Sequence, residues 1–331
     1  MERFALAAAV VLGFALTAAL CSLFVPLRRV LERREQQQQP VQSEQPRPAP
    51  LRAPLWGGLC AAAGTVAAVG VGWLAACVGQ PELLGSEGRL MTRLLTALAG
   101  SLAFGAVGLA EDVARMRSPA ALGLRRDVRL LLEALAAAFV LLLLRAAGCL
   151  PRGLGVPGAG YVLLGSAVPF LWAVLMVALA ECARIAERDE GAVCGAAFVA
   201  MLALMMVEAG LGVSGLAVLP AALAGALVAL GLWAFPPARL GAGCCGSLLA
   251  AGAIGCIPLS LDMTSLTVPL ALPFWAAGGL LAAQLLGAKR TGKPLRCWVK
   301  KHKMSPETVF LCSFALSAVG YVLALALLRW C

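Results

Sequence analysis

The sequence predicts an all-α, polytopic integral membrane protein that forms a single transmembrane domain over residues 1–331. Hydrophobic residues make up 61% of the chain and charged residues only 13%, which is not the composition of a soluble globular protein. The chain also contains about ten apolar runs that are long enough, as helices, to cross a hydrocarbon core of roughly 30 Å. A third observation, the distribution of Lys and Arg, predicts how these runs are oriented in the membrane.

The predicted spans follow one another along the whole chain. Several are rich in Ala, Gly and Leu, which favours close packing between helices. The first run has no small-residue cleavage site before Pro26, so we interpret it as an anchor and not as a signal peptide. In order, the runs are residues 4–25, 55–78, 92–110, 129–148, 162–182, 191–209, 212–234, 244–261, 267–287 and 308–329.

The net charge of +10 is concentrated in alternate connecting loops. The basic loops are 25–54, 111–129, 183–190, 235–241 and 288–307. By the positive-inside rule these loops are cytoplasmic, and an even number of spans then places both termini outside. The basic excess therefore indicates topology first and an anionic substrate second. We expect no binding to nucleic acid.

Two of these cytoplasmic loops have a distinctive composition. Residues 36–50 are rich in Gln and Pro and too polar to pack, so we expect a disordered loop. Residues 288–307 form a basic loop.

The cysteines indicate core packing. The chain has 12 Cys, most of them inside apolar runs, but no Cys-x-x-Cys motif and only one His. Small buried residues fit this pattern better than a disulfide framework or a zinc site.

Residues 234–248 form the most informative stretch. Pro236-Pro237 cannot continue a helix, and the glycines that follow allow backbone to approach backbone closely, which predicts an ordered turn before a glycine-rich helix. With Gly243 and Gly246-Ser247-Leu248, the stretch resembles the Pro-Pro-Ala-x-x-x-x-Gly-Asp-x-Gly-Ser-Leu segment of the phospho-N-acetylmuramoyl-pentapeptide transferases. The Asp of that segment, a magnesium ligand in the family, is Cys244 here. A thiol is a soft ligand and a poor partner for Mg²⁺.

The start of the second predicted span resembles the family as well. Pro54, Gly57 and Gly58 match the family's Gly-Thr-Pro-Thr-Met-Gly-Gly segment. A helix that simply begins at a proline gives the same pattern, and this reading stays open.

Charged residues between the end of the third span and the start of the fourth resemble the family's Asp-Asp pair and the two lysines after it. These residues are Glu111-Asp112, Arg115 and Arg129. The resemblance implies that the carboxylates collect Mg²⁺ or take a proton from the attacking lipid phosphate, and that the two arginines hold a diphosphate. The alternative is an ordinary helix end in which Glu111 and Arg115 form an i,i+4 pair.

The fourth and fifth matching segments lie in two further basic loops. Glu187 and Glu190 fall on two Asp positions of the family, whereas its two Asn positions hold Glu181 and Arg184. A solvated helix face with charges at i,i+3 and i,i+4 spacing is the alternative. In the last loop, Lys300-Lys301-His302 stands where the family has three histidines, and a positive-inside cluster is the alternative.

The resemblance implies a transferase of bacterial cell-wall synthesis in the plasma membrane. It would move a phospho-amino-sugar from a UDP-sugar to undecaprenyl phosphate, with Mg²⁺ as cofactor, these two substrates as partners and a possible homodimer. The implied catalytic residues are Glu111, Asp112 and Glu187, and the implied metal ligands are Asp112, Glu187 and Cys244. The implied substrate-binding residues are Arg115, Arg129, Glu190, Lys300, Lys301 and His302.

Two other functions stay open. One is a catalytically silent relative that binds lipid or nucleotide, or scaffolds a wall-synthesis complex. The other is an unrelated ten-helix transporter, for which Glu133 and Glu208 would be the only charges deep in the membrane.

Overall fold

A computed structural model gives the backbone of most of the chain. The described residues are 2–38, 56–79, 88–117, 123–151, 153–156, 160–163, 165–187, 191–235, 239–286 and 306–330.

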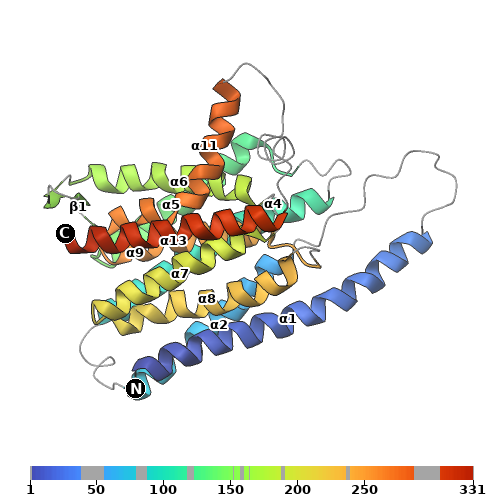
Figure 1. Cartoon of the computed structure of the whole chain (residues 1–331), viewed down its shortest axis with the longest axis horizontal. Helices are drawn as coiled ribbons and strands as arrows, with labels where there is room; N and C mark the ends of the chain where they lie inside the picture. Colours follow the sequence, from blue (N-terminus) through green and yellow to red (C-terminus); the bar gives the residue numbers. More distant parts are fainter. Residues whose placement is uncertain are drawn as a thin grey trace.

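The prediction of an all-α polytopic membrane protein is confirmed. Eight helices of the described part are long and apolar enough to cross a membrane. Most of the helices run roughly along one direction, and both chain ends lie at the same end of the bundle (Figure 1). The α-helices are α1 (Glu2–Gln38), α2 (Gly57–Gly79), α4 (Gly88–Arg117), α5 (Arg126–Ala146), α6 (Ala167–Ala186), α7 (Ala192–Gly210), α8 (Ser214–Ala234), α9 (Gly243–Ser260), α10 (Thr267–Leu270), α11 (Leu272–Leu286) and α13 (Pro306–Trp330).

Each of the ten predicted runs contains helical residues, but in two of the runs no helix is both long and apolar enough for a span. Helix α5 has the length, yet it carries Arg129, Glu133 and Arg145 in its sequence. The ninth run, 267–287, is divided into the short α10 and the 15-residue α11, after a 3₁₀ turn at Thr264–Leu266. Pro269 and Pro273 lie on either side of the break, and a proline removes a backbone donor and clashes with the preceding turn.

Two predicted boundaries were wrong. The fifth run was expected to be helical from residue 162, but β1 (Gly153–Val156) and β2 (Gly160–Leu163) form an antiparallel hairpin and α6 begins only at Ala167. The loop expected at 36–50 begins inside α1, which continues to Gln38. The rest of that loop, and the basic loop 288–307 apart from its last two residues, lie outside the described residues.

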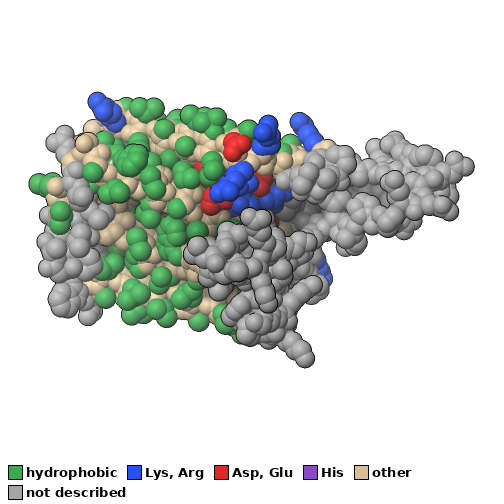
Figure 2. All heavy atoms as spheres, turned by 90° about the horizontal axis from the view of Figure 1, so that it is seen from above, with side chains coloured by type: hydrophobic (Ala, Val, Ile, Leu, Met, Phe, Trp, Pro, Cys, Tyr) green, Lys and Arg blue, Asp and Glu red, His purple; other side chains and the backbone are tan. Residues whose placement is uncertain are grey.

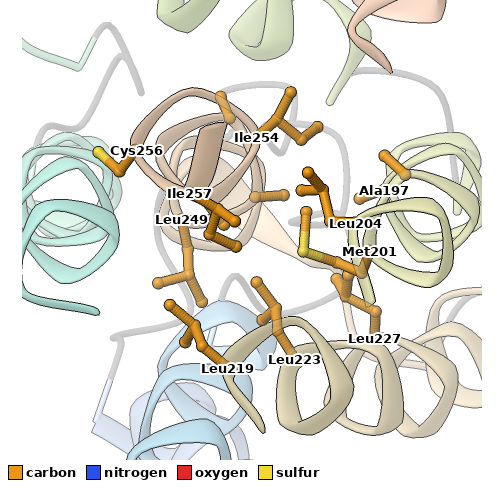
Figure 3. Packing of buried hydrophobic residues seen from close by; sticks show 14 of the residues in the cluster. Ala197, Met201, Leu204, Leu219, Leu223, Leu227, Leu249, Ile254, Cys256 and Ile257 are labelled. Atoms are coloured by element: carbon orange, nitrogen blue, oxygen red, sulfur yellow. The ribbon is translucent and has the colours of Figure 1, made fainter. Parts of the chain in front are cut away.

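Helix α9 is the centre of the bundle, and all of its 18 residues are buried. Its apolar side chains meet those of α7 and α8 in one contiguous core. Figure 3 shows Leu249 and Ile257 of α9 facing Leu219 and Leu223 of α8, while Met201 extends from α7 toward the same group of side chains. A helix without a charged residue can be enclosed in this way without burying an ion, and α9 consists of Gly, Ala, Leu and Cys together with Ser, Ile and one Pro.

Two glycines let neighbouring helices approach the start of α9. A Cβ atom on Gly58 of α2 would collide with the backbone nitrogen of Gly246, and one on Gly108 of α4 would collide with the carbonyl oxygen of Cys244. In both places backbone touches backbone, which only glycine permits. The expected close approach at residues 234–248 is therefore confirmed, and the start of α9 is held in a fixed position between α2 and α4.

Candidate functional site

The carboxylate of Asp112 caps the N-terminus of α9. Its Oδ1 accepts a hydrogen bond from the backbone N–H of Cys244 at 3.0 Å, and its Oδ2 accepts one from the N–H of Cys245 at 2.9 Å. The first N–H groups of a helix have no partner within the helix, and the positive end of the helix dipole favours an anion there. Asp112 is only 1% exposed, so these two bonds solvate a buried carboxylate.

Arg115, one turn after Glu111 on α4, lies among three carboxylates. Its Nη2 is 2.6 Å from Oε1 of Glu111, in the i,i+4 pair that the sequence suggested. Its Nη1 is 3.9 Å from Oδ1 of Asp112 and 3.7 Å from Oε2 of Glu187, which follows the end of α6. The guanidinium therefore joins the end of α4 to the end of α6.

Arg129 extends the network to α5. Its Nε donates to Oε1 of Glu181 at 2.7 Å, and its Nη1 is 3.8 Å from Oε1 of Glu111. The second oxygen of Glu181 accepts from Nη2 of Arg184 at 2.6 Å, within α6. The ends of α4, α5 and α6 are thus connected by arginine–carboxylate pairs.

We call this group of eight side chains the charged cluster. It contains five carboxylates and three guanidinium groups, so its formal charge is negative. Figure 2 shows acidic and basic side chains gathered in one patch on a face that is otherwise largely hydrophobic. The members are Glu111, Asp112, Arg115, Arg129, Glu133, Glu181, Arg184 and Glu187.

Several buried polar atoms of the charged cluster have no hydrogen-bond partner among the described residues. They are Oε2 of Glu111, both carboxylate oxygens of Glu133 and Nε of Arg184. Glu133 is fully buried, one turn after Arg129 on α5, and lies within electrostatic range of Glu181 and both neighbouring arginines. Buried carboxylates inside a membrane protein are costly unless they are paired or functional.

Cys244 lies at the edge of the cluster. Its side chain is fully buried, and its Sγ is 4.0 Å from Oε2 of Glu187. Cys244, which stands at the position of the family's metal-ligand Asp, therefore faces Glu187, another of the implied ligands.

The structure brings together every implied site residue that it describes. Glu111, Asp112, Arg115, Arg129, Glu187 and Cys244 all lie at one end of the bundle. The implied binding residues Glu190, Lys300, Lys301 and His302 lie outside the described residues and stay predictions.

Sequence reasoning missed three members of the cluster. Glu181 and Arg184 were read as part of a solvated helix face, but their side chains are only 23% and 12% exposed and pair with each other. Their place on the two Asn positions of the family pattern was the signal that could have included them. Glu133 could have been found from its position one turn after Arg129.

The site residues that the structure describes do not fit a magnesium ion. Mg²⁺ requires oxygen ligands in near-octahedral geometry, whereas both oxygens of Asp112 accept backbone N–H groups and Cys244 offers sulfur. Oε1 of Glu111 faces two guanidinium groups. In the part of the chain that is described, no three His, Cys, Asp or Glu side chains are arranged to hold a metal ion.

Comparisons with known proteins identify the family. The profile of Glycosyl transferase family 4 matches residues 94–262, which extend from α4 through α9 and include all of the charged cluster. A comparison with curated proteins gives no match. Members of the family transfer a phospho-sugar from a UDP-sugar to polyprenyl phosphate, typically with Mg²⁺. Because the match covers more than half of the chain, this protein belongs to glycosyl transferase family 4, the polyprenyl-phosphate phospho-sugar transferases.

Proposed function

We propose that this chain transfers a phospho-amino-sugar from a UDP-sugar to undecaprenyl phosphate, in the peptidoglycan synthesis of a bacterial plasma membrane. The family supports the reaction class, and the resemblance of residues 54–58 and 234–248 to the phospho-N-acetylmuramoyl-pentapeptide transferases supports the substrate. The observation that carries the proposal is the convergence of Asp112 and Arg115, both on α4, with Glu187 at the end of α6.

The proposed transfer exchanges one phosphoanhydride bond for another. An oxygen of undecaprenyl phosphate forms a bond to the phosphorus that carries the sugar, and the bond from that phosphorus to the oxygen of the uridine monophosphate group breaks. The products are undecaprenyl diphospho-sugar and UMP. Since negative charge gathers on the phosphate oxygens, such a site needs positive charge in fixed positions.

Arg115 is the cation of the cluster best placed to contact a phosphate. Its side chain is 20% exposed, against 9% for Arg129 and 12% for Arg184. One edge of its guanidinium is hydrogen-bonded to Glu111, whereas Nη1 is beyond hydrogen-bonding distance of Asp112 and of Glu187. Nη1 can donate to a phosphate oxygen, while the hydrogen bond from Nη2 to Glu111 fixes the orientation of the side chain. Glu187, 11% exposed, is the carboxylate placed to accept a proton from the lipid phosphate.

A catalytically silent relative is the second candidate function. The excess of carboxylates in the charged cluster and the thiol of Cys244 favour it, because both weaken a site for an anionic substrate and its metal. In this case the chain would bind undecaprenyl phosphate or the nucleotide without transferring the sugar.

A transfer assay separates the two candidates. The purified chain in lipid nanodiscs would be given a labelled UDP-muramoyl-peptide and undecaprenyl phosphate, and the labelled lipid product would be measured. If the chain transfers the sugar, the rate of product formation should be about 10²-fold lower in Arg115→Ala than in the unmodified chain. The matched control is Arg145→Ala at the opposite end of α5, which should leave the rate unchanged. No product from the unmodified chain, together with Arg115-dependent thermal stabilisation by undecaprenyl phosphate, would support the silent relative.

A further inference from the structure

We infer that the guanidinium of Arg115 is the resident cation of this site and takes the place of a divalent metal ion. The inference rests on the proposed function only for the identity of the substrate. Its structural content is that an arginine already lies within ion-pair distance of two of the three implied metal ligands, Asp112 and Glu187.

The first argument is position. The resemblance assigns Asp112, Glu187 and Cys244 as ligands of one metal ion. Arg115 Nη1 lies 3.9 Å from Asp112 Oδ1 and 3.7 Å from Glu187 Oε2, so the guanidinium is adjacent to two of the three implied ligands. A divalent cation bound by the same two carboxylates would be next to that guanidinium, and the repulsion between the two would oppose its binding.

The second argument is the state of the carboxylates. Asp112 faces the N-terminus of α9 with both oxygens, and the positive end of a helix dipole opposes a cation at the same group. Glu111 uses Oε1 for Arg115 and Arg129. Both oxygens of Asp112 and Oε1 of Glu111 therefore already have cationic or N–H partners, and a metal ion bound at these atoms would have to displace some of them.

The third argument is that the fold holds Arg115 in position. Gly123, in the turn before α5, has a φ of +71°, and a Cβ atom there would be 3.1 Å from Cγ of Arg115 and 3.5 Å from Cγ of Glu111. The turn thus packs against the stem of the arginine, while Glu111 binds its Nη2 from the preceding helical turn. A guanidinium held at its stem and at one edge is preorganised, as a site that acts on phosphate requires.

The chemical consequence is that the site does not need a divalent cation from solution to bind a phosphate group. A guanidinium offers five N–H donors in a rigid plane and matches a phosphate group, so it can supply the positive charge that a metal ion would supply. The ligand class is then a phosphate monoester or diphosphate, and its binding does not require a divalent cation.

Metal binding to the whole chain in nanodiscs tests the inference without any turnover. Mn²⁺ serves as the probe because its bound and free forms are distinguished by electron paramagnetic resonance, and Mg²⁺ serves as the competitor. We expect no Mg²⁺-displaceable Mn²⁺ on the unmodified chain or on Arg115→Lys, which keeps the charge. Arg115→Gln should gain a Mn²⁺ site with an affinity at least about tenfold tighter than the unmodified chain. Arg126→Gln, which removes an exposed charge from the first turn of α5, should gain nothing.

Three results would overturn the inference. The first is stoichiometric, Mg²⁺-displaceable Mn²⁺ on the unmodified chain, and this measurement decides the question even if Arg115→Gln does not fold. The second is a folded Arg115→Gln with no gain in Mn²⁺ affinity. The third is an equal gain in Arg126→Gln. A chain that fails the transfer assay but shows the expected metal pattern would remove the proposed function and leave this inference in place.

Discussion

Asp112 and Cys244 are 132 residues apart in the sequence, yet the carboxylate of one accepts a 3.0 Å hydrogen bond from the backbone N–H of the other. With the second bond, from Cys245, the end of α4 becomes the cap of α9. Two hydrogen bonds therefore connect the charged cluster to the central helix of the bundle, and a substitution in either should alter the packing of the other.

Asp112→Asn tests this cap. An amide keeps one acceptor oxygen but turns an NH₂ group toward a backbone N–H, so one of the two bonds is lost and a buried donor is left unpaired. We expect the free energy of unfolding to fall by about 1–3 kcal/mol. The control is Asp127→Asn, in the exposed first turn of α5, which should cost well under about 1 kcal/mol. The free energy of unfolding would be measured by denaturant unfolding in detergent. Equal decreases in the two variants would show that the cap does not stabilise the fold more than an exposed carboxylate does.

Gly108→Ala tests the backbone contact that brings Asp112 to α9. The added methyl group would collide with the carbonyl oxygen of Cys244, and a backbone atom of a fully buried helix cannot move away easily. We expect a loss of about 1–3 kcal/mol, as for other overpacked cores.

Gly70→Ala is the matched control for this substitution. Gly70 lies within α2, and a Cβ atom on it would meet no atom within 4 Å. Alanine should therefore stabilise this helix by up to about 1 kcal/mol through its higher helix propensity. If both alanine variants are stabilised, the close approach of α4 and α9 is not as tight as described.

The pair Arg129–Glu181 should couple α5 to α6. The two side chains are 9% and 23% exposed and join at 2.7 Å, so removing one partner leaves the other poorly solvated. In a double-mutant cycle with Arg129→Gln and Glu181→Gln we expect a coupling free energy of about 0.5–3 kcal/mol. Arg145→Gln combined with Glu181→Gln should be additive, because Arg145 lies at the other end of α5. Coupling energies of the same size in both cycles would contradict a specific pair.

The orientation predicted from the basic loops can be tested at the two ends of α5. Arg126→Cys, at the start of α5 and three residues before Arg129 of the charged cluster, should react only with a membrane-permeant thiol reagent, because this end is predicted to face the cytoplasm. Arg145→Cys should also react with an impermeant reagent in intact cells. The parent chain, which has an exposed Cys312, gives the background to subtract. The reverse pattern would invert the topology and place both termini inside.

Local sequence features predicted the fold well because a membrane helix is specified by its own composition. The runs that contain α7, α8 and α9 are continuous apolar stretches, and their hydropathy alone marks them. The hairpin before α6 and the break at Ala271 were missed because glycines and prolines within an apolar run leave its hydropathy high. Only their effect on the backbone distinguishes a strand or a break from a helix.

The site was predictable only in part, for a different reason. Motif order brought Glu111, Asp112, Arg115 and Glu187 into one hypothesis, and the structure confirms that they meet. How they use their charges was not readable, because an arginine can either bind a substrate phosphate or pair with a carboxylate on another helix. Which of the two an arginine does depends on the distances between helices, and the spacing of residues within one segment does not reveal these distances.

Cys244→Asp is the substitution that places a hard ligand back at the family's position. Cys244 is fully buried, and its sulfur is 4.0 Å from Glu187 Oε2. In the unmodified background the new carboxylate would add a negative charge to a cluster that already has more carboxylates than guanidinium groups. Arg115 already lies among three carboxylates, and Arg129 and Arg184 already pair with Glu181. We therefore expect the melting temperature to fall and no Mg²⁺ affinity to appear.

The same substitution should act in the opposite direction once Arg115 is removed. In Arg115→Gln, a carboxylate at position 244 joins Asp112 and Glu187 as oxygen donors without a competing guanidinium, so Mg²⁺ should bind and raise the melting temperature. The two substitutions should therefore be strongly non-additive in the presence of Mg²⁺ and closer to additive in EDTA. Isothermal titration with Mg²⁺ on the unmodified chain, both single variants and the double variant measures this directly. Mg²⁺ binding to the Cys244→Asp single variant as tightly as to the double variant would mean that Arg115 does not occupy the metal position.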